Sequence, residues 1–285
     1  MAHLLFILSN NLTIVVKFNY FWQLNFEVKL FSLENFDIKL NTEIIGRNFI
    51  YTEEIDSTNS FLLDKSNKFS TDGTVLLAEK QIKGHGRNNK VWYSTRGYNL
   101  TFSILLTNKK YLSKSLNILN FAASLAVANA NENIYQLKTE LKWPNDVLVN
   151  GKKMAGILME SVSHGSKVER LVIGVGINVN QILFQGNYNI PPTSMKLELN
   201  ETIERERVLA EYLNNFEETL SKFEASPGDV LKDWKSKCGL IGEKVSVTDG
   251  EKVKYGIFDD IDDEGFMLLK NKGKIEKIIF GDINV

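Results

Sequence analysis

Four short segments of this chain carry polar residues and glycines in patterns that suit ligand binding. The densest is GHGRNNK (residues 84–90), which directly follows an apolar run and places His85, Arg87 and Lys90 beside two glycines. Glycine lets a backbone approach a ligand closely, and arginine can form paired hydrogen bonds with a carboxylate or a phosphate. The segment matches neither the P-loop motif nor GxGxxG, because residue 89 is asparagine. Taken alone, it is best interpreted as an ordinary solvated turn.

The second segment, residues 142–161, reads KWPNDVLVNGKKMAGILMES. Asn150-Gly151 is the strongest hairpin signal in the chain. Lys152 and Lys153 are adjacent on the following strand, so one of them can face inward while the other faces solvent. Gly156 within an apolar strand indicates a bulge or a close approach of a ligand to the backbone. In isolation, a polar hairpin with two surface lysines is the better interpretation.

The third segment is VIGVGINVN (172–180), in which Gly174 and Gly176 fall on one face of a predicted strand and Asn178 continues that face. A strand face without side chains leaves a flat slot that can hold a thin ring system. From this stretch alone, packing against a neighbouring helix explains the glycines better.

The fourth segment is DSTNS (56–60), a typical start of a helix. Its hydroxyl groups at Ser57 and Thr58, together with the first amides of the helix, could also bind a polar head group.

Composition excludes several classes of protein. The 285 residues have a formal net charge of -1 and a pI of about 6.4, which gives no overall electrostatic attraction to nucleic acid or membrane. No stretch approaches the ~20 apolar residues of a membrane span. Cys238 is the single cysteine, which excludes an internal disulfide and a multi-cysteine zinc site and fits a reducing compartment.

The elements that must position these segments follow from hydrophobic periodicity. Residues 16–30 alternate like a strand, as an added edge hairpin or an extension, with a divergent targeting peptide as the weaker alternative. From Gly239 onward, short alternating runs separated by DG, EG and KG turns predict a small antiparallel barrel. Between them we predict strands within 42–55, 73–81, 99–107, 146–159 and 168–180, helices within 57–69, 115–130, 201–224 and 228–237, and a loop at 181–200. This order predicts an α+β protein with a mixed, largely antiparallel sheet and flanking helices.

The order and content of the four segments are more specific than any one of them. DSTNS, EKQIKGHGRNNKVWYSTRGYNLTFS, KWPNDVLVNGKKMAGILMES and VIGVGINVN together closely resemble the biotin protein ligase family, over about residues 44–180. The resemblance implies a class II aminoacyl-tRNA-synthetase-like ligase fold with a C-terminal SH3-like barrel. It divides the chain into an N-terminal extension (1–40), a catalytic domain that binds biotin and ATP (41–237) and the SH3-like domain (238–285).

The resemblance also implies a two-step reaction. The carboxylate of biotin attacks the α-phosphate of ATP, with Mg²⁺ present, to give biotinyl-5′-adenylate and pyrophosphate. A lysine of a biotin carboxyl carrier domain then attacks the adenylate. Such a reaction needs cations that offset the repulsion between two anions, rather than a Ser/His/Asp or Cys/His constellation. The implied protein is a cytoplasmic monomer or homodimer that binds neither DNA nor membrane.

Each segment supplies residues to the implied site. Lys153 and Arg87 are the implied catalytic residues, Trp92 would stack on adenine, and Asp146 would fix the site and could help to hold Mg²⁺ or the incoming lysine. The implied biotin-binding residues are Ser57, Thr58, Asn59, Gln81, Gly84, His85, Arg87, Lys153, Gly156 and Gly174. The implied nucleotide-binding residues are Arg87, Lys90, Trp92, Asn145, Lys153 and Asn178.

The chain departs from the family in the glycine-rich loop, which usually reads close to GRGRRGR. His85 replaces the first arginine and Asn88-Asn89-Lys90 replace RGR, whereas Arg87 is retained. We therefore expect adenylation to survive, and the retention of the adenylate by the loop to be altered.

Three alternatives remain. A lipoate or octanoate ligase shares the fold and the acyl-adenylate chemistry, and the KWPND and GKKMAG blocks disfavour it. A DNA-binding repressor is disfavoured because the first 40 residues read as strand and contain no arginine. A non-catalytic paralogue would have lost Lys153 or Arg87, and both are present.

Overall fold

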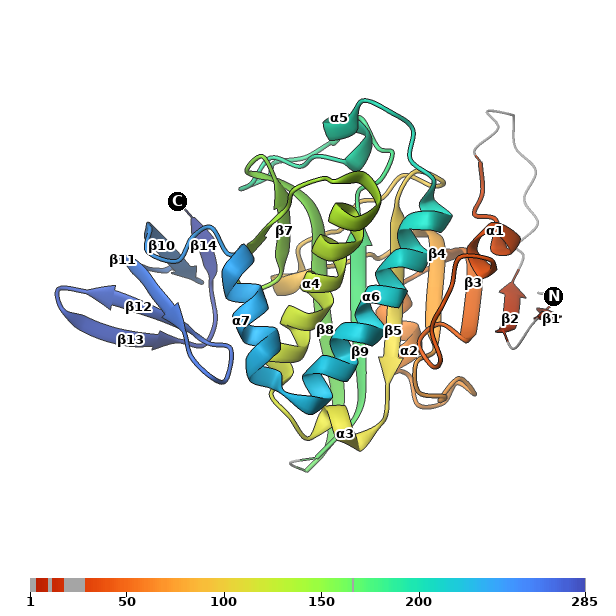
Figure 1. The fold of residues 1–285 in the computed structure, drawn as a ribbon, viewed down its shortest axis with the longest axis horizontal. Helices are drawn as coiled ribbons and strands as arrows, with labels where there is room; N and C mark the ends of the chain where they lie inside the picture. The colour runs from red at the N-terminus through yellow and green to blue at the C-terminus, as the bar shows by residue number, and fades with distance from the viewer. Residues whose placement is uncertain (1–3, 10–11, 18–28, 166, 285) are drawn as a thin grey trace.

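The structure, a computed structural model, describes residues 4–9, 12–17, 29–165 and 167–284. Its strands form a nine-stranded sheet in the order β1-β2-β3-β4-β5-β9-β8-β7-β6 and a five-stranded sheet in the order β13-β12-β11-β10-β14 (Figure 1). In the larger sheet the pairs β2–β3 and β3–β4 are parallel, and the other described pairs are antiparallel. The predicted α+β class with a mixed, largely antiparallel sheet is confirmed. The strands of this sheet are β1 (Leu4–Ser9), β2 (Leu12–Lys17), β3 (Asn48–Ile55), β4 (Val75–Gln81), β5 (Leu100–Leu106), β6 (Glu140–Lys142), β7 (Asp146–Val149), β8 (Lys152–His164) and β9 (Lys167–Ile177).

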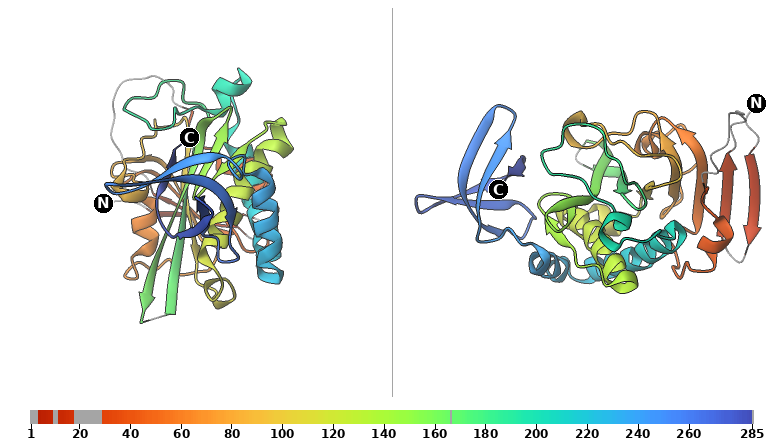
Figure 2. Two further views of the ribbon diagram at one scale, coloured as in Figure 1. Left: turned by 90° about the vertical axis from the view of Figure 1, so that its left-hand side faces the viewer. Right: turned by 90° about the horizontal axis from the view of Figure 1, so that it is seen from above.

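Helices cover both faces of the larger sheet. The long helices α4 (Leu116–Tyr135), α6 (Arg205–Ala225) and α7 (Pro227–Lys237) lie along one face (Figures 1 and 2). On β4, Val75 and Leu77 belong to the core on that side, whereas Leu76 packs with Leu62 of α2 (Thr58–Leu63) on the other side. Burial on both faces explains why the central strands read as continuous apolar runs. Within the described residues, no helix is long and apolar enough to cross a membrane.

The predicted helix starts are largely confirmed. The Ser57 side chain accepts a hydrogen bond from the Ser60 amide at 3.3 Å and caps α2, which ends earlier than predicted, at Leu63. The predicted loop at 181–200 is wrong at its end, because Ser194 caps a short helix there. The remaining short helices are α1 (Leu33–Asp37), α3 (Lys109–Leu112), α5 (Met195–Leu199) and the 3₁₀ turn η1 (Arg87–Asn89).

The β7–β8 hairpin forms as predicted. Asn150 and Gly151 have φ values of 51° and 72°, as a type I′ turn requires. The register shifts between Val147 and Leu148, which leaves Met154 as an extra residue in β8. Next to this bulge, Lys152 pairs with Glu198 on the outside and Lys153 pairs with Asp146. The two lysines therefore point in opposite directions, as expected.

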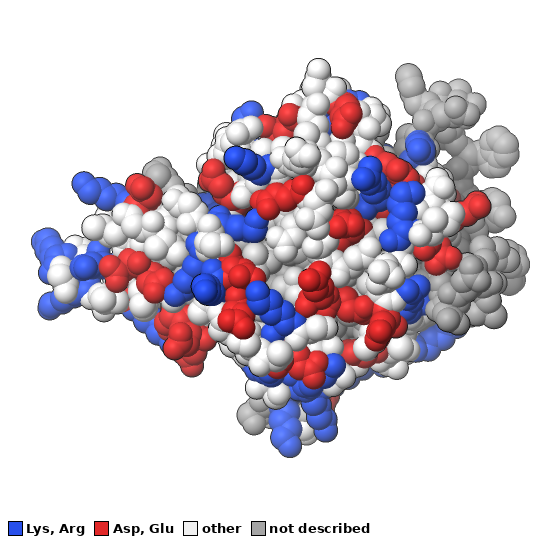
Figure 3. All heavy atoms as spheres, in the orientation of Figure 1, with Lys and Arg blue, Asp and Glu red and all other residues white. Residues whose placement is uncertain are grey.

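Both ends of the chain add β structure. β1 and β2 form an edge hairpin, and residues 16 and 17 of the strand predicted for 16–30 belong to β2. Residues 18–28 lie outside the described part. The prediction is wrong at its end, because residues 29–32 are not strand. The C-terminal sheet is antiparallel, as predicted, and its DG, EG and KG turns place Gly250, Gly265 and Gly273 at positive φ. Its strands are β10 (Lys244–Asp249), β11 (Lys252–Ile261), β12 (Met267–Asn271), β13 (Lys274–Ile278) and β14 (Asp282–Asn284). Acidic and basic side chains are intermixed over the face shown in Figure 3.

Candidate active site

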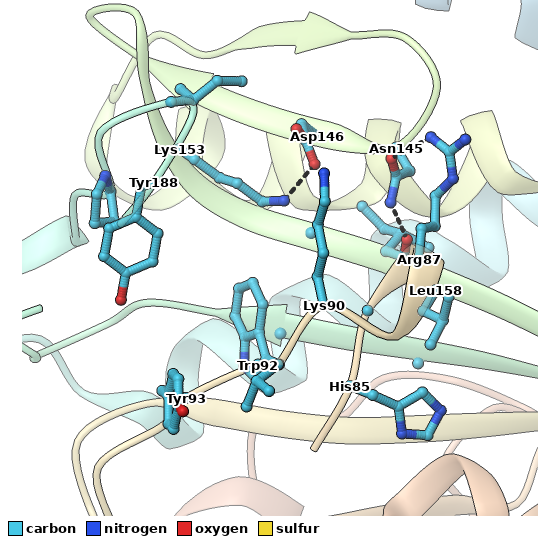
Figure 4. Close-up of a pocket in the computed structure, with 18 of the residues that line it drawn as sticks. His85, Arg87, Lys90, Trp92, Tyr93, Asn145, Asp146, Lys153, Leu158 and Tyr188 are labelled. Carbon is cyan, nitrogen blue, oxygen red and sulfur yellow. Dashed lines mark hydrogen bonds and ion pairs between the residues drawn. The ribbon is translucent and has the colours of Figure 1, made fainter. Parts of the chain in front are cut away.

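A cavity of about 570 Å³ brings all four polar segments together. Its walls come from the start of α2, the glycine-rich loop (residues 84–92) and the β6–β7 turn. The first half of β8, the last residues of β9, the loop at 184–190 and β14 complete them. Figure 4 shows several of these side chains. Segments separated by more than a hundred residues thus meet at one site, which makes it the candidate active site.

The floor of the cavity is a network of uncharged polar side chains, one of which, Asn59, is held by the carboxylate of Glu160. Gln81 Oε1 accepts hydrogen bonds from the Thr58 amide at 2.7 Å and from the Thr58 hydroxyl at 3.0 Å. Ser103 Oγ lies 2.6 Å from both Thr58 Oγ1 and Asn59 Oδ1. Asn59 Nδ2 donates to the Leu158 carbonyl at 3.2 Å and to Glu160 Oε2 at 2.7 Å. Because each side chain is fixed by its neighbours, the floor presents donors and acceptors in set positions.

The glycine face is filled by protein side chains in this structure. A Cβ atom on Gly174 would lie 2.3 Å from Asn59 Oδ1, and one on Gly176 would lie 2.4 Å from the Trp92 ring. Gly156 and Gly176 are direct cross-strand partners, and Trp92 also lies 3.4 Å from the Cβ position of Gly156. The expected flat slot therefore seats an indole, and contact between Gly174 and a ligand stays a prediction.

Charged groups gather above the floor, next to the hairpin. Lys153 Nζ lies 2.6 Å from Asp146 Oδ1 (Figure 4) and 5.9 Å from the centre of the Trp92 ring. Asn145 donates to the Ile157 carbonyl at 2.6 Å and accepts from Arg87 at 3.4 Å. The hairpin that carries Lys153 thus also positions the side chain that orients Arg87.

The C-terminal sheet closes one side of the cavity. Arg87 donates to the Gly281 carbonyl at 3.3 Å, lies 3.7 Å from Asp282 Oδ1 and stacks 4.8 Å from the centre of the Phe280 ring. Lys90 also forms an ion pair with Asp282. Burial alone would raise the pKa of Asp282, but its hydrogen bond and charge interactions with these cations lower it. Burial lowers the pKa of Arg87.

His85 links the glycine-rich loop to the floor. Its Nδ1 lies 3.1 Å from the Lys83 carbonyl, and its Nε2 lies 3.4 Å from Glu160 Oε2. Glu160 is the same carboxylate that holds Asn59. His85, which stands where the family usually has an arginine, is therefore connected to the floor network through Glu160.

Comparison with known proteins identifies the family. The model for the biotin/lipoate A/B protein ligase family matches residues 51–178, and the model for the biotin protein ligase C-terminal domain matches residues 240–285. A ligase/repressor BirA of Bacillus spizizenii is 34% identical over 249 residues, which cover 86% of this chain and 76% of that protein. The chain belongs to the biotin protein ligase family.

Other members of the family agree. The biotin–[acetyl-CoA-carboxylase] ligase of Mycobacterium tuberculosis is 29% identical over 86% of this chain and 93% of its own length. A solved biotin protein ligase from Aquifex aeolicus, in complex with biotin and ATP, superposes with a TM-score of 0.73 and 32% identity, over 83% of this chain and 97% of that chain. The chain is accordingly an enzyme of the ligase class.

Most residues that the biotin ligase resemblance implied line the cavity. Gly84 does not: it is buried where a Cβ would meet the Trp92 carbonyl at 2.8 Å. Asn178 lines the cavity but donates its side-chain amide to the Thr193 carbonyl at 3.0 Å. The others in the cavity wall are Ser57, Thr58, Asn59, Gln81, His85, Arg87, Lys90, Trp92, Asn145, Asp146, Lys153, Gly156 and Gly174.

Sequence reasoning missed three parts of this ligase site. Lys142, the first residue of KWPND, is 7% exposed and is among the residues that line the cavity. Burial lowers its pKa. The loop at 184–190 and Asp282 on β14 also line the cavity. Lys142 could have been found from the sequence, because it opens KWPND, the most specific motif. The loop at 184–190 and Asp282 lie in stretches without a motif.

The acidic side chains decide whether the cavity can hold a metal ion. Within the described part of the chain, no group of three His, Cys, Asp or Glu side chains is arranged to hold a metal. Asp146, the expected ligand, is paired with Lys153. Mg²⁺ usually binds through one or two carboxylates and the substrate phosphates, and Asp146 and Asp282 are the carboxylates in the cavity wall that could contribute.

Proposed function

We propose that this ligase joins biotin to a lysine of a biotin carboxyl carrier domain by way of biotinyl-5′-adenylate. The observation that carries the proposal is the gathering of four cationic side chains above an uncharged polar floor: Arg87, Lys90, Lys142 and Lys153. A carboxylate and a triphosphate repel each other, and cations held in a cavity offset that repulsion. The A. aeolicus relative, whose structure contains biotin and ATP, supports the same pair of substrates.

In the first step, a carboxylate oxygen of biotin bonds to the α-phosphorus of ATP. The bond from that phosphorus to the bridging oxygen breaks, and pyrophosphate leaves with the electron pair. Lys153, which extends into the cavity beside Asp146, would contact both the carboxylate and the α-phosphate. Arg87 would stabilise the charge on the phosphoryl oxygens, and Trp92 would stack on adenine.

In the second step, the neutral amine of the acceptor lysine attacks the acyl carbon of the adenylate. AMP leaves with the electron pair, and the nitrogen loses a proton as the amide forms. When Lys153 turns toward the phosphate, the carboxylate of Asp146 would be free to hold the Mg²⁺ that accompanies ATP in the first step, or the incoming lysine in the second. We place both steps in residues 41–237, with residues 238–285 supplying one wall.

The test is incubation of the full chain with biotin, ATP and Mg²⁺, followed by mass analysis for biotinyl-5′-adenylate and for a biotinylated carrier domain. Both products are expected. The matched family model covers lipoate ligases as well, so lipoate in place of biotin is the parallel arm. Adenylation of lipoate but not of biotin would replace this proposal by the lipoate ligase alternative, and the absence of any adenylate would favour a non-catalytic paralogue.

A further inference from the structure

Glu160 does not itself line the cavity, yet it contacts two side chains that do. Its Oε2 atom accepts a hydrogen bond from Asn59 Nδ2 at 2.7 Å and lies 3.4 Å from His85 Nε2. Asn59 belongs to the floor and His85 belongs to the glycine-rich loop. Figure 4 shows His85 on the side of the cavity away from the Lys153–Asp146 pair. One carboxylate on β8 therefore joins the loop to the floor.

The carboxylate of Glu160 fixes the side-chain amide of Asn59. Both hydrogens of Nδ2 are used, one by Glu160 and the other by the Leu158 carbonyl at 3.2 Å. The amide oxygen must then face the other way, where Ser103 Oγ lies 2.6 Å from it. Glu160 therefore sets the direction in which a floor residue presents its donor and acceptor, without touching a ligand itself.

The surroundings of His85 favour a donor at each of its ring nitrogens. Nδ1 lies 3.1 Å from the Lys83 carbonyl, and Nε2 faces the carboxylate of Glu160. A neutral imidazole has one N–H and one lone pair, so either tautomer turns a lone pair toward one of these two oxygens. The imidazolium form donates to both. The contact between the loop and the floor is therefore strongest when His85 carries its second proton.

The other charged side chains around His85 are directed elsewhere. The ammonium group of Lys83, two residues before it, forms an exposed ion pair with Asp56 at 2.7 Å. Arg87, two residues after it, donates to the C-terminal sheet. Helix α2, which reads TNSFLL, has no charged side chain. The charge that acts on the His85 ring from the floor side is therefore that of Glu160.

We propose that Glu160 is a positioning residue that holds the glycine-rich loop against the floor through the imidazolium form of His85. This inference rests on the proposed function, because it concerns the retention of biotinyl-5′-adenylate beneath that loop. Histidine loses its second proton between about pH 5 and pH 8, so the contact weakens and the intermediate dissociates faster as the pH rises through this range. The arginine that the family usually has keeps its charge there, so this proton dependence is a property of the present chain.

The experiment measures the dissociation rate of preformed biotinyl-5′-adenylate from the full chain at about pH 6 and about pH 8, without an acceptor. Because both members of the ion pair are partly exposed, the rate should rise only about 2- to 5-fold between these pH values. His85→Arg keeps the charge and should dissociate slowly at both. Glu160→Gln removes the charge and should dissociate fast at both.

His164→Arg is the matched control. His164 is the last residue of β8, is exposed and does not line the cavity, so the same substitution is made away from the site. This variant should keep the pH dependence of the wild-type protein. The inference is overturned if the wild-type protein and His85→Arg respond equally to pH, or if Glu160→Gln keeps the wild-type response.

A second measurement needs no ligand. Val91 pairs with His85 across the loop and is 59% exposed, so Val91→Cys can carry a nitroxide label, whereas the native Cys238 is buried. The label should become more mobile from about pH 6 to about pH 8, and adding His85→Arg should remove that response. If the label responds but biotin yields no adenylate, the proposed function is wrong and the contact stands. If adenylate forms but neither its dissociation nor the label responds to pH, the contact is wrong and the proposed function stands.

Discussion

Gly174→Ala should destabilise the protein and damage the floor of the cavity. The new methyl group would lie 2.3 Å from Asn59 Oδ1 and 2.9 Å from Asn59 Cγ, well inside van der Waals contact. Asn59 cannot simply rotate away, because it is 4% exposed and is held by Ser103, Leu158 and Glu160. Either the strand or the asparagine must move.

The size of the effect follows from these bonds. A neutral hydrogen bond contributes about 1 kcal/mol and one to a charged group about 1.5–3 kcal/mol. Losing all three bonds of Asn59 sets an upper limit of about 5 kcal/mol, and a partial shift of the backbone reduces it. We expect the free energy of unfolding to fall by about 2–4 kcal/mol, which lowers Tm by about 3–7 °C for a chain of this size.

The assay is urea unfolding together with calorimetric titration of biotin, which should bind more weakly because Asn59 lines the cavity. Gly228→Ala is the control, since no atom lies within 4 Å of its Cβ position. The decisive comparison introduces Gly174→Ala into the Asn59→Ala variant, where it should lower the free energy of unfolding only slightly. If Gly174→Ala costs the same with and without Asn59, the clash is not the cause and the reasoning fails.

Four further predictions concern single side chains. Lys153→Ala should abolish adenylate formation without unfolding the protein; biotin-dependent pyrophosphate release at the normal rate would contradict its role. Arg87→Gly should loosen retention of the adenylate, because it removes the contacts to Asn145 and the C-terminal sheet; labelling of bystander lysines should rise, and unchanged labelling would argue against this. Trp92→Ala should weaken ATP binding more than biotin binding in calorimetry, whereas equal losses would remove the stacking argument. Burial raises the pKa of Cys238 to about 11, so the thiol stays protonated at pH 8.5 and should react with iodoacetamide far more slowly in the native protein than in urea; equal rates would show that the thiol is accessible.

Local patterns predicted the local elements well. The Asn150-Gly151 turn and the cap at Ser57 depend on the conformational preferences of the residues themselves, and both formed as expected. The strand predicted at 16–30 shows the limit of this reasoning. Alternation there continues to Leu30, but residues 29 and 30 are not strand, because the period of apolar residues does not reveal where a strand ends.

The cavity was harder to predict than the elements. The four motif segments lead to most of its wall because each contains residues whose types suit anions or polar rings. Asp282 and the loop at 184–190 carry no such signal, since they reach the cavity through the packing of distant parts of the chain. Gly174 illustrates a second limit: the pattern of VIGVGINVN favoured packing against a neighbouring helix, and only the packed structure shows that Asn59 of α2 lies there.

The contribution of β14 to the cavity has a consequence for how the enzyme is made. Arg87 and Lys90 have their acidic partner almost two hundred residues further along the chain, at Asp282. A nascent chain that has already folded the whole nine-stranded sheet therefore still lacks one wall of its site. Competence to hold a nucleotide should therefore appear only after β14 has left the ribosome and has packed against the glycine-rich loop.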